Sequence, residues 1–301
     1  MSNDVRQDRI QANGLDFAFL EAGTGPLVLL LHGFPDNAQT WEHQLPALAD
    51  AGYRAVAPYI RGYPPTDVPA QPFDAEDLAN DAHALIGALG ADSAFVVGHD
   101  WGALATMSLA AAHPESVRRA VSIAAGHPRT AVQIFQSPEQ LHYAFHIWLF
   151  QVDTFAEVAL RSNDLALVEY LWRLWSTQPP DSGHVARVKK TLNEPGVIEA
   201  LISYYRGLVR IPRDKPQFFA QISQSIKVPM LVVYGEDDPL SALSENEAPF
   251  FEADYRRVVI PGAKHFPHRE RPEELTTLVL DWLAGGSQNA GATVAAESRA
   301  G

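Results

Sequence analysis

Ser93–Ser108, SAFVVGHDWGALATMS, is the stretch that decides the fold. Residues 95–97 are apolar and partly β-branched, which is typical of a strand, and residues 103–112 are the small and apolar residues of a helix. Between them, residues 98–102 (GHDWG) place a carboxylate two positions from a glycine on each side. This order predicts a strand, a sharp turn and a helix, with glycines that let the two elements approach closely. The turn would raise Asp100 above the sheet and point backbone N–H groups of the helix start toward it.

Two interpretations of Asp100 are open at this point. The spacing G-x-D-x-G matches the nucleophile elbow G-x-S-x-G, with aspartate where serine is usual. Aspartate is also a favoured first residue of a helix, so these five residues alone permit a purely structural role. A nucleophile needs a base, and the base needs an orienting acid, so the remainder of the chain decides between the two.

The composition is that of a globular protein with a large core. The chain has 301 residues, of which 47% are hydrophobic and 20% charged, and this fits one elaborated domain or two small ones. A net charge of −13 argues against a nucleic-acid partner. No apolar run is long enough to span a bilayer, and the polar first ten residues lack a signal-peptide core, so we expect no membrane partner and a cytoplasmic location. The absence of cysteine excludes disulfides, a thiolate nucleophile and a cysteine metal site.

Strand and helix patterns alternate in both parts of the chain that flank residues 128–224. Strands are expected at residues 9–21 (one or two, with a turn at Asn13-Gly14), 26–31, 53–57, 95–97, 117–123, 230–234 and 256–260. Helices are expected at residues 41–51, 75–89, 103–112 and 273–284. This alternation predicts an α/β protein with a mostly parallel, doubly wound sheet.

The alternation stops between residues 128 and 224, where the sequence is helical and aromatic. We expect an all-helical cap there, lying over the carboxyl ends of the strands, where ligands bind in open α/β sheets. The α/β core would then consist of residues 1–127 and 225–284. The tail, residues 285–301, is rich in Gly, Ala and Ser and is expected to be disordered.

Two segments place a candidate acid and a candidate base after predicted strands. Residues 235–239 (GEDDP) offer Asp238 as the acid, with Asp237 as the alternative, and either could instead be a turn residue before the proline. Residues 262–266 (GAKHF) offer His265 as the base, although an ordinary surface-loop histidine would show the same pattern. Because the carboxyl ends of parallel strands share one edge of a sheet, both side chains are expected on the same edge as Asp100.

Residues 32–35 (HGFP) follow the first buried strand and suggest an oxyanion hole. The backbone N–H groups of Phe34 and Trp101 would be its two donors. A tight turn around a buried His32 is equally compatible with this motif, and we expect His32 to be structural.

The sequence resembles the α/β-hydrolase superfamily and, within it, the epoxide hydrolases and haloalkane dehalogenases. The resemblance is carried by HGFPDNAQTW (32–41), GHDWGA (98–103), GEDDP and GAKHF, and it covers roughly residues 9–284. It implies an α/β-hydrolase fold with an inserted helical cap and no cofactor or metal. It also implies a catalytic set of Asp100 as nucleophile, His265 as base and Asp238 as the acid that orients the base.

An aspartate in place of serine points to attack on a saturated carbon. Attack on an acyl carbon would give an anhydride, whereas displacement at a saturated carbon gives an alkyl ester of Asp100. Water activated by His265 would then hydrolyse this ester, while the N–H groups of Phe34 and Trp101 stabilise the charge that develops on the aspartate. The electrophile could be an epoxide or a carbon that bears a halogen.

The leaving group separates these two possibilities, since an epoxide oxygen needs a hydrogen-bond or proton donor. The resemblance places Tyr205 at the second of two cap tyrosines of epoxide hydrolases and His146 at the first, and some relatives carry such a His–Tyr pair. Tyr143, one helical turn before His146, could reach the same face and take its place. We expect Tyr143, Tyr204 and Trp148 to line the substrate pocket, although aromatic stripes of this kind also suit a packed core.

A haloalkane or haloacid dehalogenase that uses the same Asp100, His265 and Asp238 is the second possibility. Trp101 and Trp148 could offer indole N–H groups to a halide. Phe34 stands where many haloalkane dehalogenases have asparagine, and Trp101 stands where fluoroacetate-type dehalogenases have arginine, so the resemblance favours a small apolar epoxide. A non-catalytic binding protein on the same fold is the third possibility, and it would not need the aspartate, the histidine and the acid together.

Overall fold

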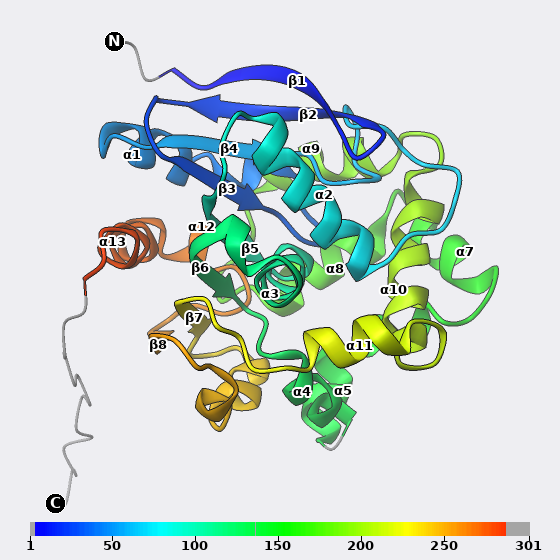
Figure 1. Ribbon diagram of the computed structural model, residues 1–301. Coiled ribbons are helices and arrows are strands. Elements are labelled where there is room, and N and C mark those ends of the chain that lie inside the picture. Colours follow the sequence, from blue (N-terminus) through cyan, green and yellow to red (C-terminus); the bar gives the residue numbers. More distant parts are fainter. Residues whose placement is uncertain (1–3, 136, 287–301) are drawn as a thin grey trace, which may run out of the picture.

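An eight-stranded sheet forms the centre of the molecule (Figure 1). In spatial order its strands are β1 (Arg6–Ala12), β2 (Leu15–Ala22), β4 (Arg54–Pro58), β3 (Leu27–Leu31), β5 (Ala94–His99), β6 (Val117–Ile123), β7 (Met230–Gly235) and β8 (Tyr255–Ile260). β1 pairs antiparallel with β2 and β2 antiparallel with β4, while every pair from β4 to β8 is parallel. This computed structural model, which describes residues 4–135 and 137–286, confirms the predicted α/β class with a mostly parallel sheet.

The predicted turn at Asn13-Gly14 joins β1 to β2. Both residues have positive φ, 44° and 77°, and Ala12 pairs directly with Leu15 across the turn. Asparagine followed by glycine is the preferred pair for such a two-residue hairpin, because both positions require positive φ.

Helices cover both faces of the sheet. α2 (Ala75–Ala88) and α3 (Trp101–Ala112) pack together on one face, and α1 (Gln44–Asp50) and α13 (Pro272–Leu283) pack together on the other (Figure 1). All five residues of β3 and all six of β7 are buried, which explains why these strands are continuous apolar runs. The short elements of the core are η1 (Ala38–Trp41), η2 (Pro114–Ser116), η4 (Pro239–Ser244), η5 (Ala248–Phe250) and α12 (Pro267–Glu270).

Residues 128–224, called the helical region below, lie between β6 and β7. Its elements are α4 (Pro128–Ala131), η3 (Val132–Phe135), α5 (Pro138–Tyr143), α6 (Phe145–Leu149), α7 (Phe155–Arg161), α8 (Ala166–Trp175), α9 (Ser182–Leu192), α10 (Val197–Asp214) and α11 (Pro216–Ile222). In Figure 1, α7, α8, α10 and α11 gather on the side toward which β3 and β4 point. The described part of the helical region contains no strand.

The tail at residues 285–301, which was expected to be disordered, falls outside the described residues apart from Gly285 and Gly286. Among the helices within residues 4–135 and 137–286, none combines the length and the apolar character needed to cross a membrane.

Candidate active site

Asp100 occupies the turn between β5 and α3, as predicted from the glycine spacing. Its backbone has φ 52° and ψ −115°, a conformation that non-glycine residues rarely adopt. A Cβ atom on Gly98 would overlap the backbone of Gly102, and one on Gly102 would overlap the carbonyl of Leu31. The Asp100 carboxylate caps no N–H group of α3, so the helix-cap interpretation does not describe this side chain.

The predicted base and acid lie beside the Asp100 side chain. The Nε2 atom of His265 is 3.6 Å from Oδ2 of Asp100, and its Nδ1 atom is 3.1 Å from Oδ2 of Asp238. Asp238 is buried, whereas Asp237 is exposed. The structure therefore places His265 between Asp100 and Asp238, and Asp237 does not take part in this arrangement.

Electrostatics favour an ion pair between His265 and Asp100. Burial alone would lower the pKa of His265, but the close contact with Asp100, the hydrogen bond with Asp238 and the negative charges of both outweigh it and raise the pKa to about 9. Burial alone would raise the pKa of Asp100, but the close contact with His265 and its positive charge lower it. At neutral pH an imidazolium therefore lies between two carboxylates.

This ion pair predicts a stability that depends on pH. The folded-state pKa of His265, about 9, lies above the unfolded value of about 6.5, so its stabilisation is fully present below pH 6.5 and is lost as the pH rises through 9. Each unit of raised pKa corresponds to about 1.4 kcal/mol. We expect the free energy of unfolding, measured with urea, to fall by at least about 1 kcal/mol more in the wild type than in His265→Gln between pH 6 and pH 9.5. Equal losses in the two proteins would contradict the ion pair.

The predicted oxyanion hole has one hydrogen bond already in place. The N–H of Phe34 donates to Oδ1 of Asp100 at 2.8 Å. Trp101 is the first residue of α3, so its N–H is one of the four that have no acceptor within the helix. His32 is buried and accepts from the N–H of Ile60 through Nε2 at 3.1 Å. Burial lowers the pKa of His32 to about 4. The ring holds the backbone at Ile60 through this hydrogen bond, as expected for a structural residue.

A cavity of about 450 Å³ opens beside Asp100 and His265. The predicted residues in its wall are Trp101, Tyr143, His146, Trp148 and Tyr205. Four buried polar atoms of this wall have no hydrogen-bond partner, and they are the hydroxyls of Tyr143 and Tyr205, Nδ1 of His146 and Nε2 of His265. Such atoms are costly to bury unless a ligand or water completes them, so they mark a binding site.

His146 and Tyr205 form the expected pair in this wall. Their rings lie 5.3 Å apart between centroids and nearly perpendicular, at 85°. Burial lowers the pKa of His146 to about 3 and, together with the charge of Asp100, raises the pKa of Tyr205 well above its usual value. Both groups are therefore neutral hydrogen-bond donors at physiological pH.

The fold agrees with comparisons to known proteins. A family model described as the alpha/beta hydrolase fold matches residues 26–272. The chain belongs to the α/β-hydrolase family. Epoxide hydrolase 3 of Xenopus tropicalis is 30% identical over 91% of this chain and 76% of its own length, and Epoxide hydrolase A of Mycobacterium tuberculosis is 29% identical over 92% and 96%. The crystal structure of Epoxide Hydrolase A from Mycobacterium thermoresistibile superposes with a TM-score of 0.79 at 25% identity, over 94% of this chain and 99% of that one.

Two tyrosines of this hydrolase lie differently from the expectation. The hydroxyl of Tyr204 hydrogen-bonds that of Tyr63 at 2.9 Å, and Tyr204 does not line the cavity, because adjacent helical residues point about 100° apart. The prediction that Tyr204 lines the substrate pocket is therefore wrong. Tyr143 lines the cavity but does not share a helical face with His146, because α5 ends at Tyr143 and α6 begins at Phe145. The Tyr143 ring lies instead 6.4 Å from that of His265.

Trp175 of α8 is a site residue that the sequence argument missed. Its ring lies 4.8 Å from that of His146 and 5.1 Å from that of His265, in the cavity wall. The pattern W-x-x-W at Trp172 and Trp175 would place both rings on one side of a helix, which is the signal that was available.

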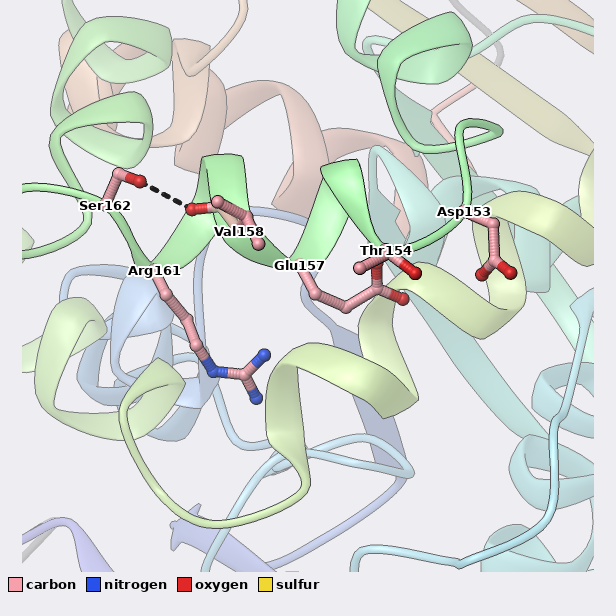
Figure 2. Close-up of a pocket in the computed structure, with 6 residues that line it drawn as sticks. All are labelled: Asp153, Thr154, Glu157, Val158, Arg161 and Ser162. Carbon is pink, nitrogen blue, oxygen red and sulfur yellow. Dashed lines mark hydrogen bonds between the residues drawn. The ribbon is translucent and has the colours of Figure 1, made fainter.

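Two features away from the cavity do not join the site of the hydrolase. Figure 2 shows a surface hollow along α7 that is lined by Asp153, Thr154, Glu157, Val158, Arg161 and Ser162, none of them a predicted site residue. His83, His113 and Glu115 are the one group of metal-ligating type, among the described residues, whose ligand atoms lie within 4.8 Å of one another. The two imidazole rings are stacked with 13° between their planes, so their in-plane lone pairs do not converge on one ion.

Proposed function

We propose that this hydrolase converts a neutral, apolar epoxide and water to a vicinal diol through a covalent ester on Asp100. The observation that carries the proposal is one cavity whose wall holds a carboxylate nucleophile, its base, and two neutral donors, His146 and Tyr205. The names of the relatives, which span nearly the whole chain, support the same activity. In this proposal the helical region acts as the cap that supplies both donors.

The first half of the reaction forms the ester. An Asp100 oxygen attacks one epoxide carbon, and the bond between that carbon and the epoxide oxygen breaks. His146 and Tyr205 donate hydrogen bonds to the departing oxygen, which takes its proton from the Tyr205 hydroxyl. Because the pKa of Tyr205 is raised, proton transfer accompanies ring opening rather than preceding it.

The second half releases the diol. Water attacks the Asp100 carboxyl carbon, His265 takes the proton of the water, and the Phe34 N–H stabilises the oxyanion. The bond between the carboxyl carbon and the ester oxygen then breaks, and His265 returns the proton of the water to the diol. His265 can act as this base because ester formation removes the negative charge of Asp100 that holds its pKa high, so the imidazolium first gives up its proton, which restores the Tyr205 hydroxyl. The proton that Asp100 releases as it returns to a carboxylate then charges His265 again.

The cavity wall selects for a neutral substrate. Among the described residues that line it there is no lysine, arginine or glutamate, and Asp100 is the single acid. Most other lining residues are aliphatic or aromatic, including Leu104, Ile147, Leu208, Phe219 and Leu243. A substrate carboxylate or amine would lose its hydration here and would meet no charged group beyond the paired Asp100 and His265, which carries a large free-energy cost.

The donors in the wall favour an epoxide over a halide. Of the tryptophans in the wall, Trp175 offers no free indole N–H to a halide, because that group already donates to the carbonyl of Tyr143 at 3.1 Å. The Tyr205 hydroxyl and His146 Nδ1 have no partner and suit an oxygen leaving group.

The test of this function is turnover of styrene oxide and of 1-bromobutane by the purified protein. We expect the diol from styrene oxide and no bromide from 1-bromobutane. Tyr205→Phe should slow diol formation by about 100-fold or more, since positioned proton donors contribute about 10²–10⁴ in rate. The matched control is Tyr204→Phe, because that hydroxyl bonds Tyr63 outside the cavity wall. Bromide without diol would favour the dehalogenase. If neither diol nor bromide is formed, both enzymatic activities are contradicted.

A further inference from the structure

The Trp172 side chain of α8 contacts two of the loops that carry catalytic groups. Its indole N–H donates to the carbonyl oxygen of Pro35 at 2.9 Å, and Pro35 directly follows the oxyanion-hole residue Phe34. Its ring stacks on Phe266, with 3.9 Å between centroids and 7° between planes, and Phe266 directly follows His265. One buried side chain therefore touches the residue after each catalytic group.

The carboxyl end of α8 is bound to the same base-carrying loop. The last carbonyls of a helix have no donor within the helix and need one from elsewhere. The Nζ atom of Lys264 donates to the carbonyl of Leu174 at 2.6 Å, and the N–H of His265 donates to the carbonyl of Trp175 at 3.0 Å. The loop that carries the base thus completes the helix end, and this fixes where Trp172 lies relative to His265.

We propose that Trp172 is a positioning residue that holds the Phe34 loop and the His265 loop in register and thereby sets the rate at which the Asp100 ester is hydrolysed. This inference rests on the proposed function, because it concerns the second half of that reaction. Ester hydrolysis needs the Phe34 N–H at the oxyanion and the His265 imidazole at the water in the same moment. Ring opening depends instead on donors from α6 and α10.

The Trp172→Phe variant separates positioning from packing. Phenylalanine keeps an aromatic ring against Phe266 but removes the N–H that holds Pro35. The matched control is Trp282→Phe in α13, since Trp282 is equally buried and its indole N–H donates to the carbonyl of Ala120 at 3.0 Å, outside the cavity wall. Both variants lose one buried hydrogen bond of the same kind, so a purely structural effect should be similar in the two.

The experiment measures ester formation and ester hydrolysis separately, by rapid quench and mass spectrometry with styrene oxide. In Trp172→Phe we expect hydrolysis to slow by about 10-fold to 100-fold, because small displacements of catalytic groups have effects of this size. Ester formation should keep its wild-type rate. In steady state kcat and KM should therefore fall together and kcat/KM should hold, while Trp282→Phe should match the wild type in both steps.

Two results would overturn the inference. One is an equal loss in both steps of Trp172→Phe, which a packing defect would produce, and the other is wild-type rates in both. Failure of the proposed function is a different observation, since the wild type itself would then form neither ester nor diol.

Discussion

His265→Gln is expected to form the ester on Asp100 once and then stop. The base lies 3.6 Å from Asp100 but neither attacks the epoxide nor donates to its oxygen. The first half of the reaction should therefore survive the loss of His265. Hydrolysis should slow by about 10²–10⁴-fold, the usual contribution of a general base. Intact-mass measurement after incubation with styrene oxide should show one added substrate per chain, and peptide mapping should place it on Asp100.

Asp238 and Asp237 provide a matched pair for the same measurement. Asp238→Asn removes the carboxylate 3.1 Å from His265 Nδ1 and should also make the ester accumulate, because the imidazolium loses its partner. Asp237→Asn makes the same chemical change one residue earlier, on an exposed side chain, and should leave turnover at the wild-type rate. An ester mapped to any residue other than Asp100, or no ester in His265→Gln, would contradict the assigned nucleophile.

The buried strands could be predicted from sequence because their chemistry is uniform. The strands expected at residues 26–31 and 230–234 are β3 (Leu27–Leu31) and β7 (Met230–Gly235), and every residue of both is buried. A strand covered on both faces must be apolar throughout, so it differs from its surroundings. Helix boundaries were harder. The helix expected at 41–51 is η1 followed by α1 from Gln44, because a helical turn that included residue 42 would clash with the ring of Pro46.

The core half of the site was predictable for a related reason. Parallel strands end on one edge, so polar residues just after β5, β7 and β8 had to meet, and Asp100, Asp238 and His265 do. The helical region offers no such rule. Several of its helices are short, and the break at Ala144 between α5 and α6 separates Tyr143 from His146 although their spacing suggests one face. Which of two adjacent tyrosines faces the cavity depends on how α10 is rotated, and tertiary packing alone decides that.

Asp100→Ala and Asp100→Gly should both abolish diol and ester formation, yet differ in stability in an unusual direction. Without the carboxylate no oxygen is left to attack the epoxide, and the loss of other enzyme nucleophiles lowers kcat by on the order of 10⁶-fold. At most positions alanine is more stable than glycine. Here φ is 52°, where a Cβ is strained, so Asp100→Gly should be more stable than Asp100→Ala by about 1 kcal/mol.

The two variants control each other because both lack the carboxylate and its hydrogen bond to Phe34. Their difference in the free energy of unfolding, measured with urea, therefore reports the backbone strain at the elbow. If the alanine variant proves equally or more stable, the turn is not strained in solution and the geometry assigned to Asp100 is wrong. If glycine proves more stable while neither variant forms ester, the residue that carries the proposed chemistry is also one that the fold holds at a cost to stability.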